Sequence, residues 1–309
     1  MMGLPIYGFV MGGALLHAIS NIIKKKLLTQ AVHEDFVTVV TMLGAACAGF
    51  SGSLIFYGTP NVQQGFWIPF AITAFLNVFI QYLNIKSLKL EDASIVVPLS
   101  SAMPMFAILM SYVILGEWPT AWGRVGIVLI GIGAYTLYLG GKPVALPKTM
   151  ASVCPVRWQN FLAYWGGPWF RLFASKGARL ALLVAYLGAI SISFDKLGVL
   201  RSDPMFFTGS VFTIVACVVF FESMRRGVWQ KLSKEMFWRV FMVGMMFGVA
   251  ACMYNAGYYY GIAPYVGALK RTQILWTVLL AFLFLGEGYF RQRIIGSAVL
   301  FLGTILLSL

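Results

Sequence analysis

Apolar runs of membrane-spanning length recur ten times along this chain of 309 residues. A helix rises about 1.5 Å per residue across about 30 Å of hydrocarbon, so one span needs about 20 apolar residues. The runs cover residues 6–23, 37–56, 66–83, 95–115, 122–139, 180–194, 205–221, 237–255, 263–285 and 292–309. The sequence therefore predicts an all-α membrane protein with ten transmembrane helices embedded in a lipid bilayer.

The composition leaves no room for a separate soluble catalytic domain, since 60% of the residues are hydrophobic and only 11% are charged. The chain has no P-loop, no GxSxG and no HExxH motif, so we expect neither an enzyme nor a cofactor. No metal site is expected either, because four single cysteines are scattered without ligand spacing. These are Cys47, Cys154, Cys217 and Cys252.

The basic residues alternate between loops, and this pattern predicts the orientation of the chain. The loops after spans 1, 3, 5, 7 and 9 are rich in Lys and Arg, whereas the other loops have only Arg124, Lys196 and Arg201. Because cytoplasmic loops carry the excess of Lys and Arg, both termini are expected on the non-cytoplasmic side. The same placement explains the net charge of +13 without a nucleic-acid partner. We expect a bacterial inner (plasma) membrane protein.

A common offset relates the two halves of the chain. Shifting the sequence by 170 residues lays Leu115-Gly116-Glu117 on Leu285-Gly286-Glu287, and also lays Gly126 on Gly296 and Gly133 on Gly303. Each half has five spans, so the second half enters the membrane inverted. Residues 1–140 are the first predicted repeat, 141–178 a cytoplasmic linker and 179–309 the second repeat. Inverted repeats are typical of alternating-access transporters, whose substrate sites lie near the midplane.

The paired LGE motifs, each followed by a glycine-spaced helix, resemble the drug/metabolite transporter superfamily with its EamA-type repeats. The resemblance covers essentially the whole chain. It implies two inverted five-helix repeats around a central cavity for a small-molecule substrate. It also implies that spans 5 and 10 lie toward the periphery, where a homodimer could form. Members carry amino acids, amines, nucleotide sugars or phosphorylated sugars, so the resemblance leaves the substrate open.

Lys270 and Arg271 lie about 10 Å inside the ninth run. On insertion scales each cation costs about 2.5–3.5 kcal/mol at the helix centre, so the pair needs compensation. Asp195 is expected at the end of span 6, and no acid is expected at matching depth. An anionic ligand in a hydrated cavity would supply the compensation; alternatively, Lys270 snorkels or pairs with Asp195 or Glu91. The pair is similar to the phosphate-binding pair of plastid triose-phosphate translocators, but their third cation has no evident counterpart here.

Further polar residues inside the spans are expected to line the substrate pathway. With Lys270 and Arg271 as substrate-binding residues we group His17, Asn21, Asn77, Gln81, Ser100, Tyr254, Asn255 and Gln273. Ser100 is the repeat-equivalent of Lys270. Pro98 and Pro104 favour a hinge in span 4, because proline removes a helical hydrogen bond. The short sixth run is expected to be polar-lined or broken.

These features predict a secondary transporter, specifically an antiporter or uniporter for a small organic anion that carries a phosphate or a carboxylate. Two alternatives stay open. In an amino-acid or drug exporter the cationic pair would be structural, and in a lipid-phosphate flippase the ligand would enter from the bilayer. The expected lack of a buried acid weighs against a proton-coupled exporter of cationic drugs.

Overall fold

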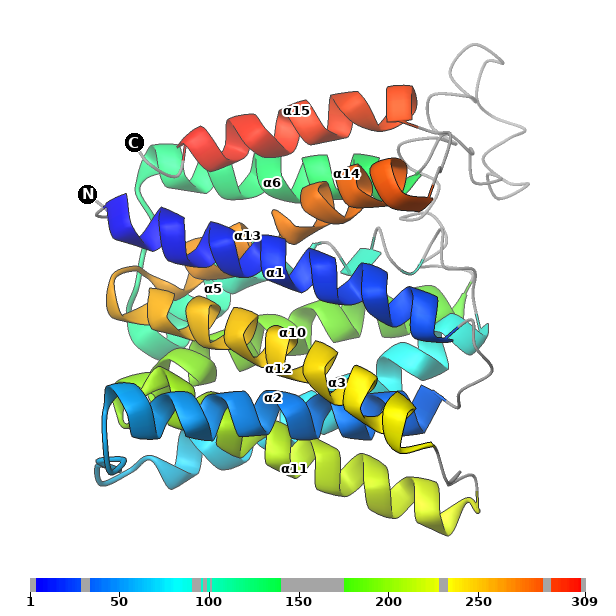
Figure 1. Cartoon of the computed structure of the whole chain (residues 1–309). Coiled ribbons are helices and arrows are strands. Elements are labelled where there is room, and N and C mark those ends of the chain that lie inside the picture. The colour runs from blue at the N-terminus through cyan, green and yellow to red at the C-terminus, as the bar shows by residue number, and fades with distance from the viewer. Residues whose placement is uncertain are drawn as a thin grey trace. The chain divides into compact units, whose positions relative to one another are not determined.

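The computed structural model describes residues 4–28, 34–90, 96, 99–100, 102–139, 175–227, 233–285 and 290–306, and their regular secondary structure is entirely helical (Figure 1). The helices are α1 (Leu4–Leu28), α2 (Glu34–Phe56), α3 (Trp67–Leu90), α5 (Met103–Leu115), α6 (Ala121–Leu139), α10 (Lys176–Leu200), α11 (Pro204–Arg225), α12 (Lys234–Ala256), η1 (Gly257–Tyr259), α13 (Ala263–Lys270), α14 (Gln273–Leu285) and α15 (Phe290–Leu306).

Helix lengths agree with the expected spans except at the fourth, sixth and ninth spans. Within the described residues, α2, α3, α10, α11 and α12 contain stretches long and apolar enough to cross a membrane. Of the two alternatives for the sixth span, the broken helix is wrong, because α10 runs unbroken for 25 residues and contains Ser191, Ser193 and Asp195. The ninth span is interrupted, since residues 263–285 form two helices, α13 and α14, and the fourth span has a turn at Ala102 before α5 begins.

The chain divides into two compact units, and each unit draws on both predicted repeats. Unit 1 comprises Met1–Val78 with Ser191–Gly286, and unit 2 comprises Phe79–Ile190 with Glu287–Leu309. Helices α3 and α10 contribute residues to both units. The predicted linker lies outside the described residues up to residue 174, and its last three residues already belong to α10.

In unit 1, α2 and α11 are equivalent helices of the two repeats, and they run antiparallel. At the start of α2, Asp35 lies 3.0 Å from the guanidinium of Arg226, which caps the end of α11. At the other end of α2, the Ser53 hydroxyl donates to Asp203, the N-cap of α11, at 2.8 Å. Equivalent helices that run in opposite directions are what an inverted repeat requires.

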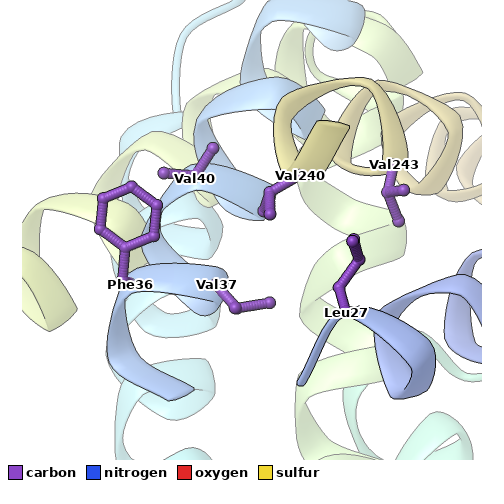
Figure 2. Packing of buried hydrophobic residues seen from close by; sticks show 6 residues of the cluster. All are labelled: Leu27, Phe36, Val37, Val40, Val240 and Val243. Atoms are coloured by element: carbon purple, nitrogen blue, oxygen red, sulfur yellow. The ribbon is translucent and has the colours of Figure 1, made fainter. Parts of the chain in front are cut away.

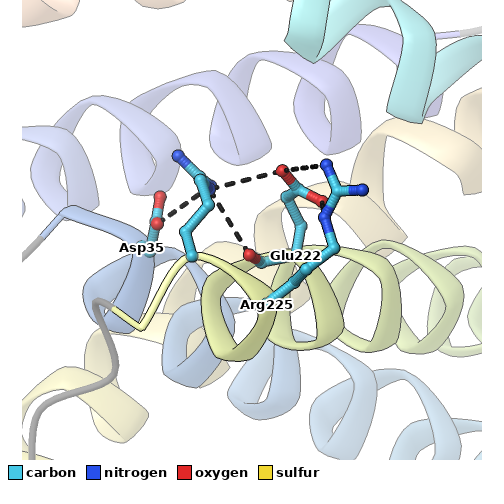
Figure 3. Close-up of polar contacts among 4 residues, drawn as sticks. Asp35, Glu222 and Arg225 are labelled. Carbon is cyan, nitrogen blue, oxygen red and sulfur yellow. Dashed lines mark hydrogen bonds and ion pairs between the residues drawn. The ribbon is translucent and has the colours of Figure 1, made fainter.

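Two clusters close the end of unit 1 where α2 begins. Six apolar side chains from the end of α1 and the starts of α2 and α12 pack together (Figure 2): Leu27, Phe36, Val37, Val40, Val240 and Val243. Beside them Glu222 bridges Arg225 at 3.2 Å and Arg226 at 3.4 Å, and Arg226 also reaches Asp35 (Figure 3). We call the end of unit 1 that contains these two clusters the basic end.

In unit 2, α6 and α15 form a second antiparallel pair, seen side by side in Figure 1. A Cβ placed on Gly133 would lie 2.8 Å from the carbonyl oxygen of Gly296, and one placed on Gly303 would lie 2.8 Å from that of Gly126. These four residues are the glycines related by the 170-residue offset. The reciprocal contacts therefore have the two-fold symmetry of an inverted repeat, and the missing side chains allow the close approach.

The offset also relates helix boundaries. Adding 170 to the bounds of α5 gives those of α14, residues 273–285, and adding it to α2 gives 204–226, against 204–225 observed for α11. The fold class predicted from the sequence is therefore confirmed: an all-α membrane protein built from two inverted five-helix repeats.

Candidate functional site

The ninth span is interrupted at the predicted cationic pair. Helix α13 ends at Lys270 and α14 begins at Gln273, with Arg271 and Thr272 in the turn between them. The turn is held by short-range bonds, from the Arg271 amide to the Ala268 carbonyl at 2.9 Å and from the Thr272 amide to the Leu269 carbonyl at 3.0 Å. The negative end of one helix dipole and the positive end of another thus meet beside two cations.

Tyrosines surround the ammonium group of Lys270. It donates a hydrogen bond to the Tyr258 hydroxyl at 3.0 Å, and it lies 4.9 Å and 5.4 Å from the ring centroids of Tyr258 and Tyr254. Tyr258 is 1% exposed, so its ring forms a fixed wall against which the ammonium rests. Ring faces attract cations electrostatically, and this interaction replaces part of the hydration that Lys270 loses.

A chain of hydrogen bonds joins Tyr254, which lies beside Lys270, to His17 of α1 and Gln273 of α14. Nδ1 of His17 lies 3.3 Å from the Tyr254 hydroxyl, which donates to Oε1 of Gln273 at 3.2 Å. The edge of the His17 ring also packs on Phe247, with centroids 4.9 Å apart. Four of the predicted site residues, Lys270, His17, Tyr254 and Gln273, therefore come together in unit 1. We call these four the Lys270 cluster.

Asp195 lies inside α10, five residues before its end, and this corrects its expected place at the end of span 6. Its carboxylate interacts electrostatically with Lys270. An acid inside a span therefore does interact with Lys270, and the argument that no carboxylate matches the depth of the cationic pair is wrong. Lys270 and Arg271 against Asp195 leave a formal surplus of one positive charge, which favours an anionic or zwitterionic ligand over a cationic one.

A further cation, Lys24, interacts with His17 of the Lys270 cluster. The Lys24 ammonium, two turns further along α1, lies 4.3 Å from the ring centroid of Phe247. His17 interacts electrostatically with both Lys24 and Lys270. His17 therefore interacts with two cations.

Arg271 interacts electrostatically with Lys270 and Tyr254 of the Lys270 cluster, whereas Asn255 and Asn77 make their described hydrogen bonds elsewhere. Asn255 donates to the Thr208 hydroxyl at 2.8 Å and so links α12 to α11. Asn77 donates to the Thr73 carbonyl of its own helix at 3.0 Å. Asn21 is half-buried one turn beyond His17, Arg271 is half-buried in the turn, and Gln81 is exposed. Gln81 and Ser100 belong to unit 2.

Sequence reasoning missed two residues near the site. Tyr258 belongs to a run of three tyrosines at the end of a span, a pattern typical of interfacial anchoring. Lys196 was placed in a loop, but it lies in α10, is 8% exposed and donates to the Gly261 carbonyl at 2.8 Å. The sequence signal for this position was that Lys196 directly follows Asp195 in a run that also contains Ser191 and Ser193.

Among the described residues no group of three or more His, Cys, Asp or Glu side chains is arranged to hold a metal ion. Apolar side chains dominate the exposed surface of the described helices, as a lipid environment requires. Leu54, Ile55 and Phe56 near the end of α2 are 62%, 76% and 72% exposed. These helices, the inverted repeats and the polar break inside one span together define a polytopic membrane protein of the transporter class.

Comparison with known proteins narrows this class. The model of the EamA-like transporter family matches residues 4–139 and again residues 175–309. The chain belongs to this family, and its two matched segments correspond to the two repeats. No curated protein gives a significant sequence match. A crystal structure of another protein superposes with a TM-score of 0.76, covering 98% of each chain at 15% identity, and this likeness supports the fold alone.

Proposed function

We propose that this membrane transporter is a secondary transporter that moves a small organic solute bearing a carboxylate or a phosphate by alternating access. Lys270 would bind the anionic group of the solute. The observation that carries the proposal is the position of Lys270 at a helix break, where it bonds to Tyr258 and faces the His17–Tyr254–Gln273 chain. Broken helices at the midplane are where secondary transporters bind their substrates.

The surroundings of Lys270 are suited to exchanging one anionic partner for another. Lys270 contacts a neutral hydroxyl and two ring faces, and it interacts electrostatically with the Asp195 carboxylate. A phosphate or carboxylate would offer a charge-assisted hydrogen bond, which is stronger than the bond to a neutral phenol. Arg271, the next residue, would add a planar guanidinium suited to bidentate contact with the same group.

A thermal-shift screen of the purified protein in detergent tests this proposal. The panel contains phosphorylated sugars, nucleotide sugars, carboxylates, amino acids, polyprenyl phosphates and cationic drugs. An anionic compound should stabilise the wild type and the Lys270→Arg variant but not Lys270→Met. Arg239→Met is the matched control, because Arg239 is an exposed cation paired with Glu235 on α12. If Lys270→Met responds to every compound as the wild type does, Lys270 is not the anion-binding residue.

Asp195 favours a second candidate, an exporter of amino acids. An α-amino acid carries both charges, so its carboxylate would meet Lys270 while its ammonium met Asp195. The Asp195→Asn variant separates the two candidates: it should lose stabilisation by amino acids but keep stabilisation by simple anions. Stabilisation confined to polyprenyl phosphates would instead indicate a lipid-phosphate flippase.

A further inference from the structure

The loops at the end of unit 1 opposite the basic end interlock. They are residues 57–66 after α2, 201–203 after α10 and 257–262 after α12. The Arg201 guanidinium donates to the Gly65 carbonyl at 3.0 Å, and the Gln63 amide donates to the Arg201 carbonyl at 2.9 Å. The Tyr259 hydroxyl donates to the Ser202 carbonyl at 3.2 Å. We call this the tyrosine end of unit 1.

Buried groups close the tyrosine end further. Phe66 is fully buried and packs against Phe206 and Phe207 at the start of α11, with centroids 5.8 Å and 6.4 Å away. Partial burial, with Asp203 and Tyr260 nearby, raises the pKa of Tyr57. The tyrosine end is thus held by carbonyl-directed hydrogen bonds and aromatic packing, without the exposed ion pairs of the basic end.

Lys196 is the buried member of this network. Its ammonium donates to the Gly261 carbonyl at 2.8 Å, although its position within α10 takes it out of water. A buried lysine is costly unless it is hydrogen-bonded, so this bond constrains the segment that contains Gly261. The Gly261 amide in turn donates to the Gly257 carbonyl at 3.1 Å, which closes residues 257–261 into one compact turn.

The same turn contains Tyr258, the residue that accepts the hydrogen bond from Lys270. Two lysines therefore hold residues 257–262, Lys196 through a backbone carbonyl and Lys270 through a side-chain hydroxyl. An anion that binds the Lys270 ammonium would replace its hydrogen bond to Tyr258. The hydrogen bond from Lys196 to the Gly261 carbonyl would remain.

We propose that Lys196 is a positioning residue that latches residues 257–262 closed at the tyrosine end, so that ligand binding at Lys270 loosens this end of the transporter. The coupling half of this proposal rests on the proposed function, whereas the latch itself does not. Residues 257–262 are short, lie between α12 and α13 and contact both the loop after α10 and the Lys270 cluster, so they can transmit a change at one to the other.

Hydrogen–deuterium exchange of the purified full chain, read by mass spectrometry without any ligand, tests the latch. Lys196→Met should raise the exchange rate of amides in residues 257–262 by about tenfold, the effect of losing one hydrogen bond to a charged group. Arg201→Met is the matched control. Arg201 is a cation at the same end that also donates to a backbone carbonyl, and its loss should speed exchange in residues 57–66 instead.

Lys196→Arg keeps a cationic donor and should restore slow exchange in residues 257–262. If Lys196→Met fails to fold, Lys196→Gln, which is neutral and shorter, gives the same reading. Unchanged exchange in residues 257–262, or an equal rise throughout the chain, would overturn the latch. For the coupling, the anionic compound found in the thermal-shift screen should speed exchange in residues 257–262 of the wild type, and protection there would overturn the coupling. Should no anion bind, the proposed function fails while the latch result stands.

Discussion

Equivalent helices in the two repeats are interrupted at equivalent residues but carry different chemistry at the interruption. In the second repeat, α14 begins at Gln273 after a turn in which the Thr272 amide bonds to the Leu269 carbonyl. In the first repeat, α5 begins at Met103 after a turn in which the Ala102 amide bonds to the Leu99 carbonyl. Each pair of residues is related by the 170-residue offset.

The side chains at the two breaks are not equivalent. Lys270 occupies the second break and Ser100 the corresponding position of the first. The backbone therefore preserves the repeat, while charge is concentrated on one side of it. The two repeats share their backbone arrangement, whereas the difference in charge between the two breaks marks the proposed substrate site. The following predictions test this difference between the repeats.

The largest effect is expected at Lys270. Lys270→Met should weaken binding of an anionic solute by about 10- to 100-fold, because a hydrogen bond to a charged group contributes about 1.5–3 kcal/mol. Ser100→Ala at the equivalent position should change the affinity by less than about fivefold, since a neutral hydrogen bond contributes about 1 kcal/mol or less. Isothermal titration of both variants measures the contrast, and equal losses would show that the two breaks share the function.

A large effect on stability is expected when a lysine is introduced at the break of the first repeat. Ser100→Lys places a cation where the chain has a hydroxyl, so unfolding should become easier by about 2.5–3.5 kcal/mol, the insertion cost of one lysine. Thermal unfolding in detergent checks this result. A fully stable Ser100→Lys variant would mean that the first break accommodates a cation as well as the second does.

Gly133 and Gly303 test the two-fold contact between α6 and α15, where the two repeats are equivalent. Gly133→Ala and Gly303→Ala each place a methyl group 2.8 Å from a backbone carbonyl oxygen of the facing helix. Each should destabilise the protein by about 1–3 kcal/mol, the usual cost of overpacking, and the two losses should be similar. A large loss from one variant and none from the other would contradict the two-fold contact between α6 and α15.

A smaller effect is expected at Tyr258. Tyr258→Phe keeps the ring beside Lys270 but removes the hydroxyl that accepts its hydrogen bond. Without that competing partner, Lys270 should bind an anion more tightly by about tenfold, the low end of the 1.5–3 kcal/mol that a hydrogen bond with one charged partner contributes. The same titration provides the test, and a strong loss of affinity would place the hydroxyl on the ligand itself.

Much of this fold could be predicted from the sequence, because hydropathy identifies spans and the 170-residue offset relates them. The break in the ninth span could not, since residues 263–285 remain apolar on average and a single turn at Thr272 is enough to divide the helix. Pro98 lies outside the described residues, whereas Pro104 stands in the first turn of α5, close to the break of span 4.

The Lys270 cluster was predictable in part. His17, Tyr254 and Gln273 stood out as polar residues inside apolar runs, and they do meet near Lys270. Asn255 showed the same pattern but bonds to Thr208, because the identity of a polar side chain does not reveal which neighbouring helix it faces. Asp195 was misplaced because the predicted span ended too early.

Uptake of the best anionic compound into proteoliposomes tests the central claim most directly. The account predicts that wild-type protein and Ser100→Ala transport it at similar rates, that Lys270→Arg retains part of the activity, and that Lys270→Met falls to the level of empty vesicles while its thermal stability in detergent remains near that of the wild type. Transport by Lys270→Met at the wild-type rate would contradict the account, because the cation at the helix break would then have no part in moving the solute.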